Sequence, residues 1–134
     1  MTLIQLIGIL YPLGYIEGNV KTWQNTTFNR EERFMRLAQL DEVRGAQIRG
    51  DVIIDVREAH EYAQGHVYGA VNIPLSILQH RVDEIPKGRQ VYVICQSGSR
   101  SVTGATILNR AGIEAASVVG GTSGWRDAGF AIVA

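Results

Sequence analysis

The chain has little cysteine, with one among its 134 residues, and this scarcity limits its chemistry. A single cysteine excludes an internal disulfide, and it fits a reducing compartment in which a reactive thiol stays available. We therefore expect a cytoplasmic protein. One cysteine and three histidines give no convincing set of metal ligands, so we expect neither a metal nor another cofactor.

A surplus of charge of either sign is also missing, because thirteen basic residues balance thirteen acidic ones. Without net charge or a basic run, nothing in the composition calls for nucleic acid or an anionic membrane as a partner. The hydrophobic fraction of 46% and the charged fraction of 19% are typical of a globular protein. The length suits one domain with a single core.

Long hydrophobic runs are lacking too. The first charged side chain is Glu17, and the apolar residues 2–16 before it are interrupted by Gln5, Pro12 and two glycines. A membrane-spanning helix needs about 20 apolar residues, and a secretory signal needs a basic start, so this stretch fits neither. We expect residues 1–33 to be an apolar arm with a polar linker, packing on the domain or on a second copy in a homodimer. A membrane-proximal or partner-docking arm is the alternative.

The most informative pattern lies at residues 91–102. Residues 91–94 form an uninterrupted β-branched and aromatic run, which is typical of a parallel strand covered on both faces. Cys95 follows this run and opens a short polar loop. Apolar residues then recur at steps of three, at Val102, Ala105, Leu108 and Ala111. That spacing predicts a helix, and Gly112 is a natural stop.

The loop after Cys95 has the features of an anion-binding site. The first backbone N–H groups of a helix have no partners inside it, so a loop curled before them can present several amides to one anion. Gly98 allows the tight turn, and both the helix end and Arg100 favour a thiolate over a thiol. We therefore interpret Cys95 as a nucleophile. The competing interpretation is a core thiol. A Walker-type phosphate loop is disfavoured because its spacing of glycines and lysine is absent.

Polar side chains follow a second predicted strand, at residues 52–56. Asp55 and Arg57 lie where it ends, at the edge where an open parallel sheet binds ligands. A carboxylate within an apolar strand must be paired or hydrogen-bonded, so we interpret Asp55 as a scaffold residue. Arg57 fits either the scaffold or the lining of a pocket. His66 lacks an obvious aspartate partner, so we interpret it as a hydrogen-bonded turn residue rather than a general base.

Shorter patterns complete the predicted domain. Residues 58–62 and 74–85 favour helices. Residues 70–73 and 115–119 are predicted to be strands, the second being the last of the chain, and Trp125 is expected to pack a final short helix onto the core. Strands that alternate with helices indicate an α/β domain with a parallel sheet.

The loop from Cys95 to Ser101 resembles the active-site loop of the rhodaneses, the single-domain thiosulfate sulfurtransferases. Three further stretches match the family in its order: Ile54-Asp-Val-Arg-Glu58, Gly65-His-Val-Tyr-Gly-Ala-Val-Asn-Ile-Pro74 and Gly120-Gly-Thr-Ser-Gly-Trp125. Four matches in order, over residues 34–134, make the resemblance specific. The chain departs from the family at Tyr68, where proline is commoner, and in the segment before residue 34.

The resemblance implies the fold. It implies a rhodanese-like three-layer α/β/α domain at residues 34–134, with a five-stranded parallel sheet and the Cys95 loop at the carboxyl edge of the central strand. It also implies a first strand at residues 34–37 and a helix at residues 40–48, whereas the local pattern at residues 29–32 resembles a helix start. Residues 1–33 would be an N-terminal extension.

The resemblance also implies a sulfurtransferase mechanism. The Cys95 thiolate would attack the outer sulfur of thiosulfate or another sulfane-sulfur donor, and the resulting persulfide would pass its sulfur to cyanide, a small thiol or a thioredoxin-like acceptor. Arg100 would act with Cys95 in catalysis by steering the anionic donor. The remaining substrate-binding residues would be Gln96, Ser97, Gly98, Ser99, Ser101 and Arg57.

Other activities occur on similar loops. Dual-specificity phosphatases and arsenate reductases of this fold carry C-x5-R, whereas Cys95 to Arg100 is C-x4-R. The tighter ring of amides should fit one sulfur atom better than a tetrahedral oxyanion. An arsenate reductase with an internal resolving cysteine is excluded by the cysteine count, and a non-catalytic binding module of this family usually lacks the cysteine. A sulfur relay to a protein acceptor is left open.

Deleting residues 1–33 tests the arm. Residues 2–16 contain eight Leu or Ile side chains, and burying one is worth about 1.5–3 kcal/mol, so the arm needs an apolar partner surface. The truncated chain should keep the sulfurtransferase chemistry but show lower stability or a smaller assembly by light scattering. If the intact chain pellets with lipid vesicles and the truncated chain does not, the arm is a membrane anchor instead.

Overall fold

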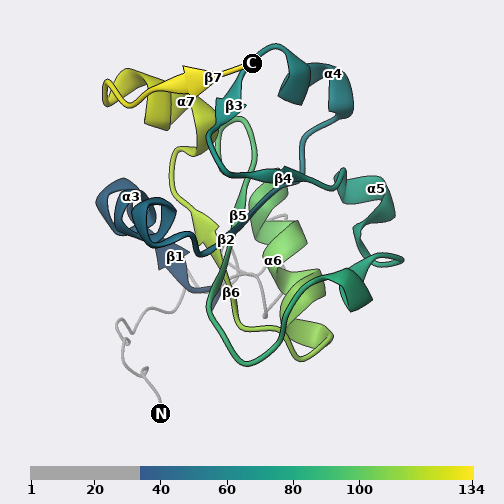
Figure 1. Ribbon diagram of the computed structural model, residues 1–134. Helices are drawn as coiled ribbons and strands as arrows, with labels where there is room; N and C mark the ends of the chain where they lie inside the picture. Colours follow the sequence, from purple (N-terminus) through teal and green to yellow (C-terminus); the bar gives the residue numbers. More distant parts are fainter. Residues whose placement is uncertain (1–33) are drawn as a thin grey trace, which may run out of the picture. The chain divides into compact units, whose positions relative to one another are not determined.

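Five parallel strands form the central sheet of residues 34–134, the part of the chain that the computed structural model describes (Figure 1). They run in the order β1, β6, β5, β2 and β4 across the sheet. Their bounds are Leu37–Ala38 for β1, Val52–Asp55 for β2, Val71–Asn72 for β4, Val91–Ile94 for β5 and Ala115–Val118 for β6. β5, which precedes Cys95, is therefore the central strand, as expected.

Helices cover both faces of the sheet and make three layers (Figure 1). α5 (Leu75–Leu78) and α6 (Arg100–Arg110) lie on one face, and α3 (Leu40–Arg49) and α7 (Gly121–Asp127) lie on the other. α4 (Ala59–Ala63) follows the carboxyl end of β2. This confirms the three-layer α/β/α fold, and α3 confirms the helix expected at residues 40–48.

The burial of β5 explains its uninterrupted apolar run. In its register, Tyr92 lies opposite Ile53 of β2 and Ala116 of β6. Because successive side chains point to opposite faces, Val91 and Val93 enter the core under α6, whereas Tyr92 and Ile94 enter the core under α3 and α7. A strand with helices on both faces has no side exposed to water and therefore needs no polar alternation.

Two predicted elements have bounds that differ from the observed ones by more than one residue. β1 begins at Leu37 rather than at residue 34, because the chain pairs with β6 only over Leu37 and Ala38. The helix predicted over residues 74–85 ends at Leu78, and a separate 3₁₀ turn covers Val82–Glu84. The backbone leaves the helical region at Arg81, with φ −124° and ψ 11°, so the apolar spacing that suggested one helix spans two short ones.

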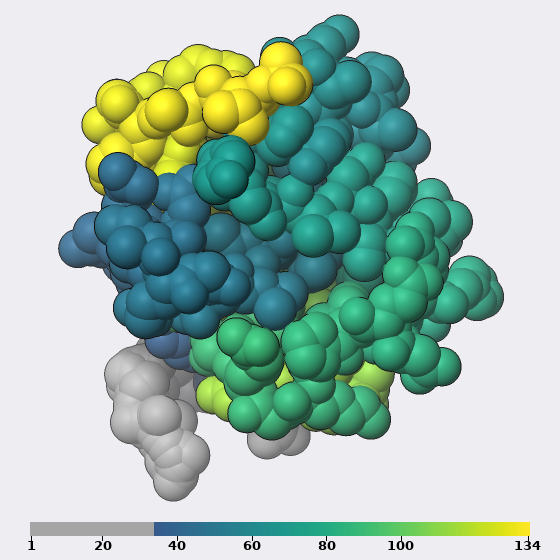
Figure 2. Space-filling model, in the orientation of Figure 1, coloured from purple at the N-terminus to yellow at the C-terminus, as the bar shows by residue number. Residues whose placement is uncertain are grey.

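A small second sheet was not predicted at all. β3 (His66–Val67) pairs antiparallel with β7 (Ile132–Val133), so the strand at residues 115–119 is not the last of the chain. Figure 2 shows the C-terminal segment, in yellow, lying against the teal segment that contains β3. Two residues per strand are too few to show an alternating pattern, so the sequence carries no signal for this pairing.

The predicted arm and the helix start suggested at residues 29–32 lie outside the described residues. Within residues 34–134, none of the helices has the length and hydropathy needed to cross a bilayer. The outcome expected for the arm therefore stays a prediction.

Replacing Trp125 tests the core under α7. Its side chain is 1% exposed, its indole N–H donates to the carbonyl of Ala131, and its ring meets the edge of Phe130. Trp125→Ala should lower the free energy of unfolding by about 3–5 kcal/mol, measured by urea denaturation. Tyr68→Ala is the control, because the Tyr68 side chain is 68% exposed and its loss should cost about 0.5 kcal/mol or less. Equal losses in the two variants would contradict this view of the core.

Candidate active site

Cys95 lies at the carboxyl end of β5, where the loop of residues 96–99 leads into α6. The residue is 1% exposed, and its Sγ accepts a hydrogen bond of 3.1 Å from the backbone N–H of Gly98. Gly98 can make this contact because its φ is +112°, a backbone conformation that other residues rarely adopt. One amide of the loop is thus directed at the sulfur, as expected of a loop that holds an anion.

A second contact to the sulfur comes from the first turn of α6. The hydroxyl of Ser101 lies 3.4 Å from Sγ of Cys95 and 2.8 Å from the hydroxyl of Ser117 on β6. All three residues are buried. A thiolate can only accept, so when Cys95 is ionised Ser101 donates to it and Ser117 donates to Ser101. As a thiol, Cys95 donates to the hydroxyl of Ser101; as a thiolate, it would accept hydrogen bonds from both the loop and the helix.

The N-terminus of α7 holds the outer side of the loop. Thr122 donates to the carbonyl oxygen of Cys95 through both its N–H and its hydroxyl, and the N–H of Ser123 donates to the carbonyl oxygen of Gln96. A Cβ on Gly121 would lie 2.5 Å from the carbonyl oxygen of Cys95, so only glycine fits there. In the sequence this segment appears only as a stretch that matches the family, and nothing in it indicates that it holds the loop.

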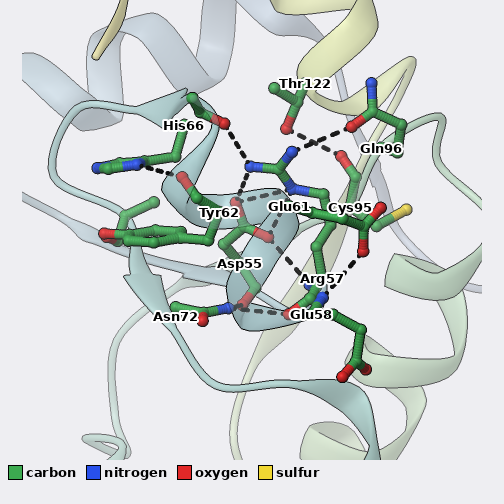
Figure 3. A network of polar contacts seen from close by, with 12 residues as sticks. Asp55, Arg57, Glu58, Glu61, Tyr62, His66, Asn72, Cys95, Gln96 and Thr122 are labelled. Atoms are coloured by element: carbon green, nitrogen blue, oxygen red, sulfur yellow. Dashed lines mark hydrogen bonds and ion pairs between the residues drawn. The ribbon is translucent and has the colours of Figure 1, made fainter. Parts of the chain in front are cut away.

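Arg57 is buried in a network that joins β2 to the loop (Figure 3). Its guanidinium donates to both carboxylate oxygens of Asp55, to Oε1 of Gln96 at 3.0 Å and to the carbonyl oxygen of Gly65 at 2.8 Å. The amide group of Gln96 donates in turn to the hydroxyl of Ser123 at 2.7 Å. Asp55 is thus paired, as expected of a carboxylate within an apolar strand, and its role as a scaffold residue stays a prediction. In Figure 3 the sulfur of Cys95 points away from the guanidinium of Arg57.

Arg100 makes a bidentate ion pair with Glu61 of α4. Its Nη1 and Nη2 lie 2.8 Å and 3.0 Å from the two carboxylate oxygens. Arg100 lowers the pKa of Glu61 to about 2, chiefly by this hydrogen bonding, and the N–H of Glu58 adds to the effect. The stabilisation from the ionised carboxylate is fully present above the ordinary pKa of a glutamate and is lost only as the pH falls toward 2. Glu61 in return raises the pKa of Arg100, and the charge of Cys95 contributes.

Glu61 is one of the site residues that the sequence did not predict, together with Ser117, Thr122 and Ser123. It is 39 positions from Arg100, so no local spacing links the two. The available signal was the pair Glu58 and Glu61 at the start of a predicted helix, which suits a helix cap and gave no hint of a partner in the loop.

The structure brings most of the predicted site residues together around the sulfur. Gly98 and Ser101 contact it, Gln96 lies between Arg57 and Ser123, and Arg100 is held at the side by Glu61. Ser97 and Ser99 are exposed. His66 lies 2.9 Å from the carbonyl oxygen of Tyr62 through Nδ1 and stacks on its ring, which confirms a hydrogen-bonded histidine, although it lies in β3 rather than a turn. No group of three metal-ligating side chains occurs within residues 34–134.

This arrangement can stabilise negative charge on a sulfur atom. The N-terminus of an 11-residue helix, the Gly98 amide and the Ser101 hydroxyl converge on one buried thiol. Such surroundings suit a sulfur nucleophile or a sulfur atom bonded to it, because the donors are already fixed before any reaction.

Comparisons with known proteins agree with this geometry. The family model described as a rhodanese-like domain matches residues 39–128. YqhL, an uncharacterized protein of Bacillus subtilis, is 40% identical over 96 residues, which cover 71% of this chain and 75% of that protein. A sulfurtransferase of Allochromatium vinosum is 32% identical over 105 residues, which cover 78% of this chain and 91% of the relative. The crystal structure of a rhodanese-related protein from Thermoplasma volcanium gives a TM-score of 0.68 at 28% identity, covering 73% of this chain and 97% of that one.

Adding one methyl group at residue 121 tests how α7 holds the loop. In Gly121→Ala the new Cβ would collide with the carbonyl groups of Cys95 and Gln96, so the loop must shift away from the helix. We expect the rate constant for the reaction of Cys95 with iodoacetamide to change by more than threefold. The free energy of unfolding should fall by more than about 1–2 kcal/mol, which is the cost of placing a residue with a Cβ at this positive φ.

Gly129→Ala is the matched control for this variant. Gly129 also has a positive φ, of +87°, but a Cβ there would meet no atom within 4 Å. It should lose stability through strain and keep the alkylation rate of Cys95. If both variants leave that rate unchanged, the contact between α7 and the loop does not control the thiol.

Proposed function

Since this chain belongs to the rhodanese-like family of sulfurtransferases and their relatives, we propose that it transfers sulfane sulfur through a persulfide formed on Cys95. The observation that carries the proposal is the position of the thiol. Cys95 lies at the carboxyl end of the central strand, under the Gly98 amide and at the N-terminus of α6. Those donors stabilise a thiolate before reaction and the inner sulfur of a persulfide after it.

The proposed reaction has two half-reactions. The Cys95 thiolate attacks the outer sulfur of thiosulfate, a new S–S bond forms, and the S–S bond of the donor breaks, so that sulfite leaves with the bonding electrons. Cyanide, a small thiol or a thioredoxin-like protein thiol then attacks the outer sulfur of the persulfide. Thiocyanate or a new persulfide is formed, and Cys95 leaves as the thiolate. No metal, oxidant or reductant is needed in either step.

The loop residues have separate parts in this proposal. The backbone of residues 96–101 surrounds the transferred sulfur, with Ser97 and Ser99 on the exposed side where donor and acceptor arrive. Arg100 supplies a fixed positive charge near the anionic donor and the departing sulfite. Arg57 takes part through Gln96, whose side-chain oxygen it holds, rather than through direct contact with the sulfur.

The length of the loop bears on the competing reactions, and the burial of the thiol bears on the cellular compartment. The loop has only four residues between Cys95 and Arg100, and its Gly98 amide lies close to the single sulfur atom of Cys95. This short loop supports sulfur transfer over phosphate-ester hydrolysis. A buried thiol that must cycle through a thiolate also suits a reducing compartment such as the cytoplasm.

Replacing the nucleophile tests the proposed function. After treatment with thiosulfate, the intact mass of the native protein should increase by one sulfur atom, and the protein should produce thiocyanate from thiosulfate and cyanide. Cys95→Ser should abolish both results, because a serine hydroxyl cannot form the persulfide. Ser76→Ala, an exposed change on α5, should keep both.

Two outcomes would overturn this assignment. One is a Cys95→Ser variant that retains full sulfurtransferase turnover. The other is a native protein that hydrolyses p-nitrophenyl phosphate faster than it turns over thiosulfate, which would show that the loop binds a tetrahedral oxyanion as its substrate.

A further inference from the structure

The ion pair between Arg100 and Glu61 bears on which anions can approach Cys95. Both terminal nitrogens of Arg100 are engaged by the two oxygens of the Glu61 carboxylate, at 2.8 Å and 3.0 Å. The side chains are partly buried, with 36% of Arg100 and 24% of Glu61 exposed, so solvent screens the pair only in part. The positive charge of Arg100 is therefore partly offset by the carboxylate of Glu61 on α4.

The positive charge of Arg57 is offset in the same way. Arg57 is paired with Asp55 at 2.8 Å, and both side chains are buried. Since the pKa of Glu61 is held at about 2, chiefly by Arg100, its carboxylate stays charged at neutral pH. Within residues 34–134, the two arginines of this site are thus each paired with a carboxylate, and this pairing weakens the positive field that an incoming anion meets.

We propose that Glu61 determines the charge preference of the Cys95 site, because it offsets Arg100 and so disfavours dianionic reagents relative to neutral or singly charged ones. For the proposed sulfur transfer, on which this reading of the donor rests, the preferred donor class is the persulfide of a small thiol rather than thiosulfate. The Cys95 thiolate attacks the outer sulfur of R–S–SH, the new S–S bond forms, the old one breaks, and R–S⁻ leaves with its electron pair.

Glu61 acts here through Arg100 and through its own charge, without touching the donor. Two effects therefore act in the same direction when the carboxylate is neutralised. The field at the sulfur becomes more positive, and Arg100 gains freedom to contact an anion. Because solvent screens this charge only in part, we expect the rate constant for attack on the sulfur to change on the order of threefold to tenfold for each unit of charge on the reagent.

Alkylation of Cys95 measures this charge preference independently of sulfur transfer. Iodoacetate and iodoacetamide attack the same thiol by the same chemistry and differ by one negative charge. The rate constant for iodoacetate divided by that for iodoacetamide should rise about threefold to tenfold in Glu61→Gln. This ratio should approach the native value as salt is added. An unchanged ratio would overturn the proposal.

The control is Glu58→Gln, which removes the same charge from the start of the same helix. Glu58 is exposed and, within residues 34–134, makes no hydrogen bond or ion pair with Arg100, whereas Glu61 holds Arg100 through two hydrogen bonds. The alkylation ratio of this variant should stay within about twofold of the native ratio. Equal increases in both variants would show a diffuse effect of helix charge and would also overturn the proposal.

A third variant separates charge from folding. Glu61→Asp keeps the carboxylate, so its alkylation ratio should stay near the native one even if the shorter side chain lowers stability. In Glu61→Gln, the side-chain amide oxygen can still accept a hydrogen bond from the backbone N–H of Glu58, so α4 keeps a cap. If Glu61→Asp raises the ratio as much as Glu61→Gln, the effect comes from a displaced loop and the assignment to charge is wrong.

Donor kinetics then extend the result to the proposed reaction. The ratio of kcat/KM for thiosulfate to kcat/KM for 2-hydroxyethyl persulfide should rise in Glu61→Gln in the same direction as the alkylation ratio, and a fall would contradict the preferred donor class. If neither donor adds sulfur to the native protein, the proposed function fails. The alkylation ratio still decides in that case whether Glu61 sets the charge preference of the site.

Discussion

The guanidinium of Arg57 is the group on which the arrangement of the site depends. It is buried, and it joins three separate segments, because Asp55 belongs to β2, Gln96 to the loop and Gly65 to the segment before β3. A buried charge is tolerated only when it is fully paired, and removing one partner of such a pair costs about 3–5 kcal/mol. The position of the loop is therefore set by the electrostatic requirements of an arginine that does not touch the sulfur.

The polarity of the loop follows from where its backbone groups are satisfied. The carbonyl oxygens of Cys95 and Gln96 accept hydrogen bonds from the N-terminus of α7, on the outer side. The peptide groups that follow can then turn an N–H inward, and the one at Gly98 reaches the sulfur. Two helix N-termini thus act on one loop: α7 binds its carbonyl groups, and α6 contributes its positive end to the thiol.

The sequence was sufficient for the parts of the fold that have a local signal. The apolar run of β5, the polar loop after Cys95 and the helical spacing that follows it predicted the strand, loop and α6 directly. The break between α5 and the 3₁₀ turn was missed because Val82 and Ile85 keep a helical spacing across it. Contacts such as that of Arg100 with Glu61 depend on how distant segments meet, and residue spacing contains no record of them.

The pairing of β3 with β7 has a consequence for how the protein matures. Ile132 and Val133 pack against Gly65, whose carbonyl oxygen is one of the acceptors of Arg57. During synthesis the loop, β2 and α4 leave the ribosome well before residues 132–133 do. The support behind Gly65 is therefore missing until the C-terminal residues emerge, and Arg57 gains its complete surroundings only after β7 has left the ribosome. Cys95 therefore leaves the ribosome before the strand that completes the surroundings of Arg57.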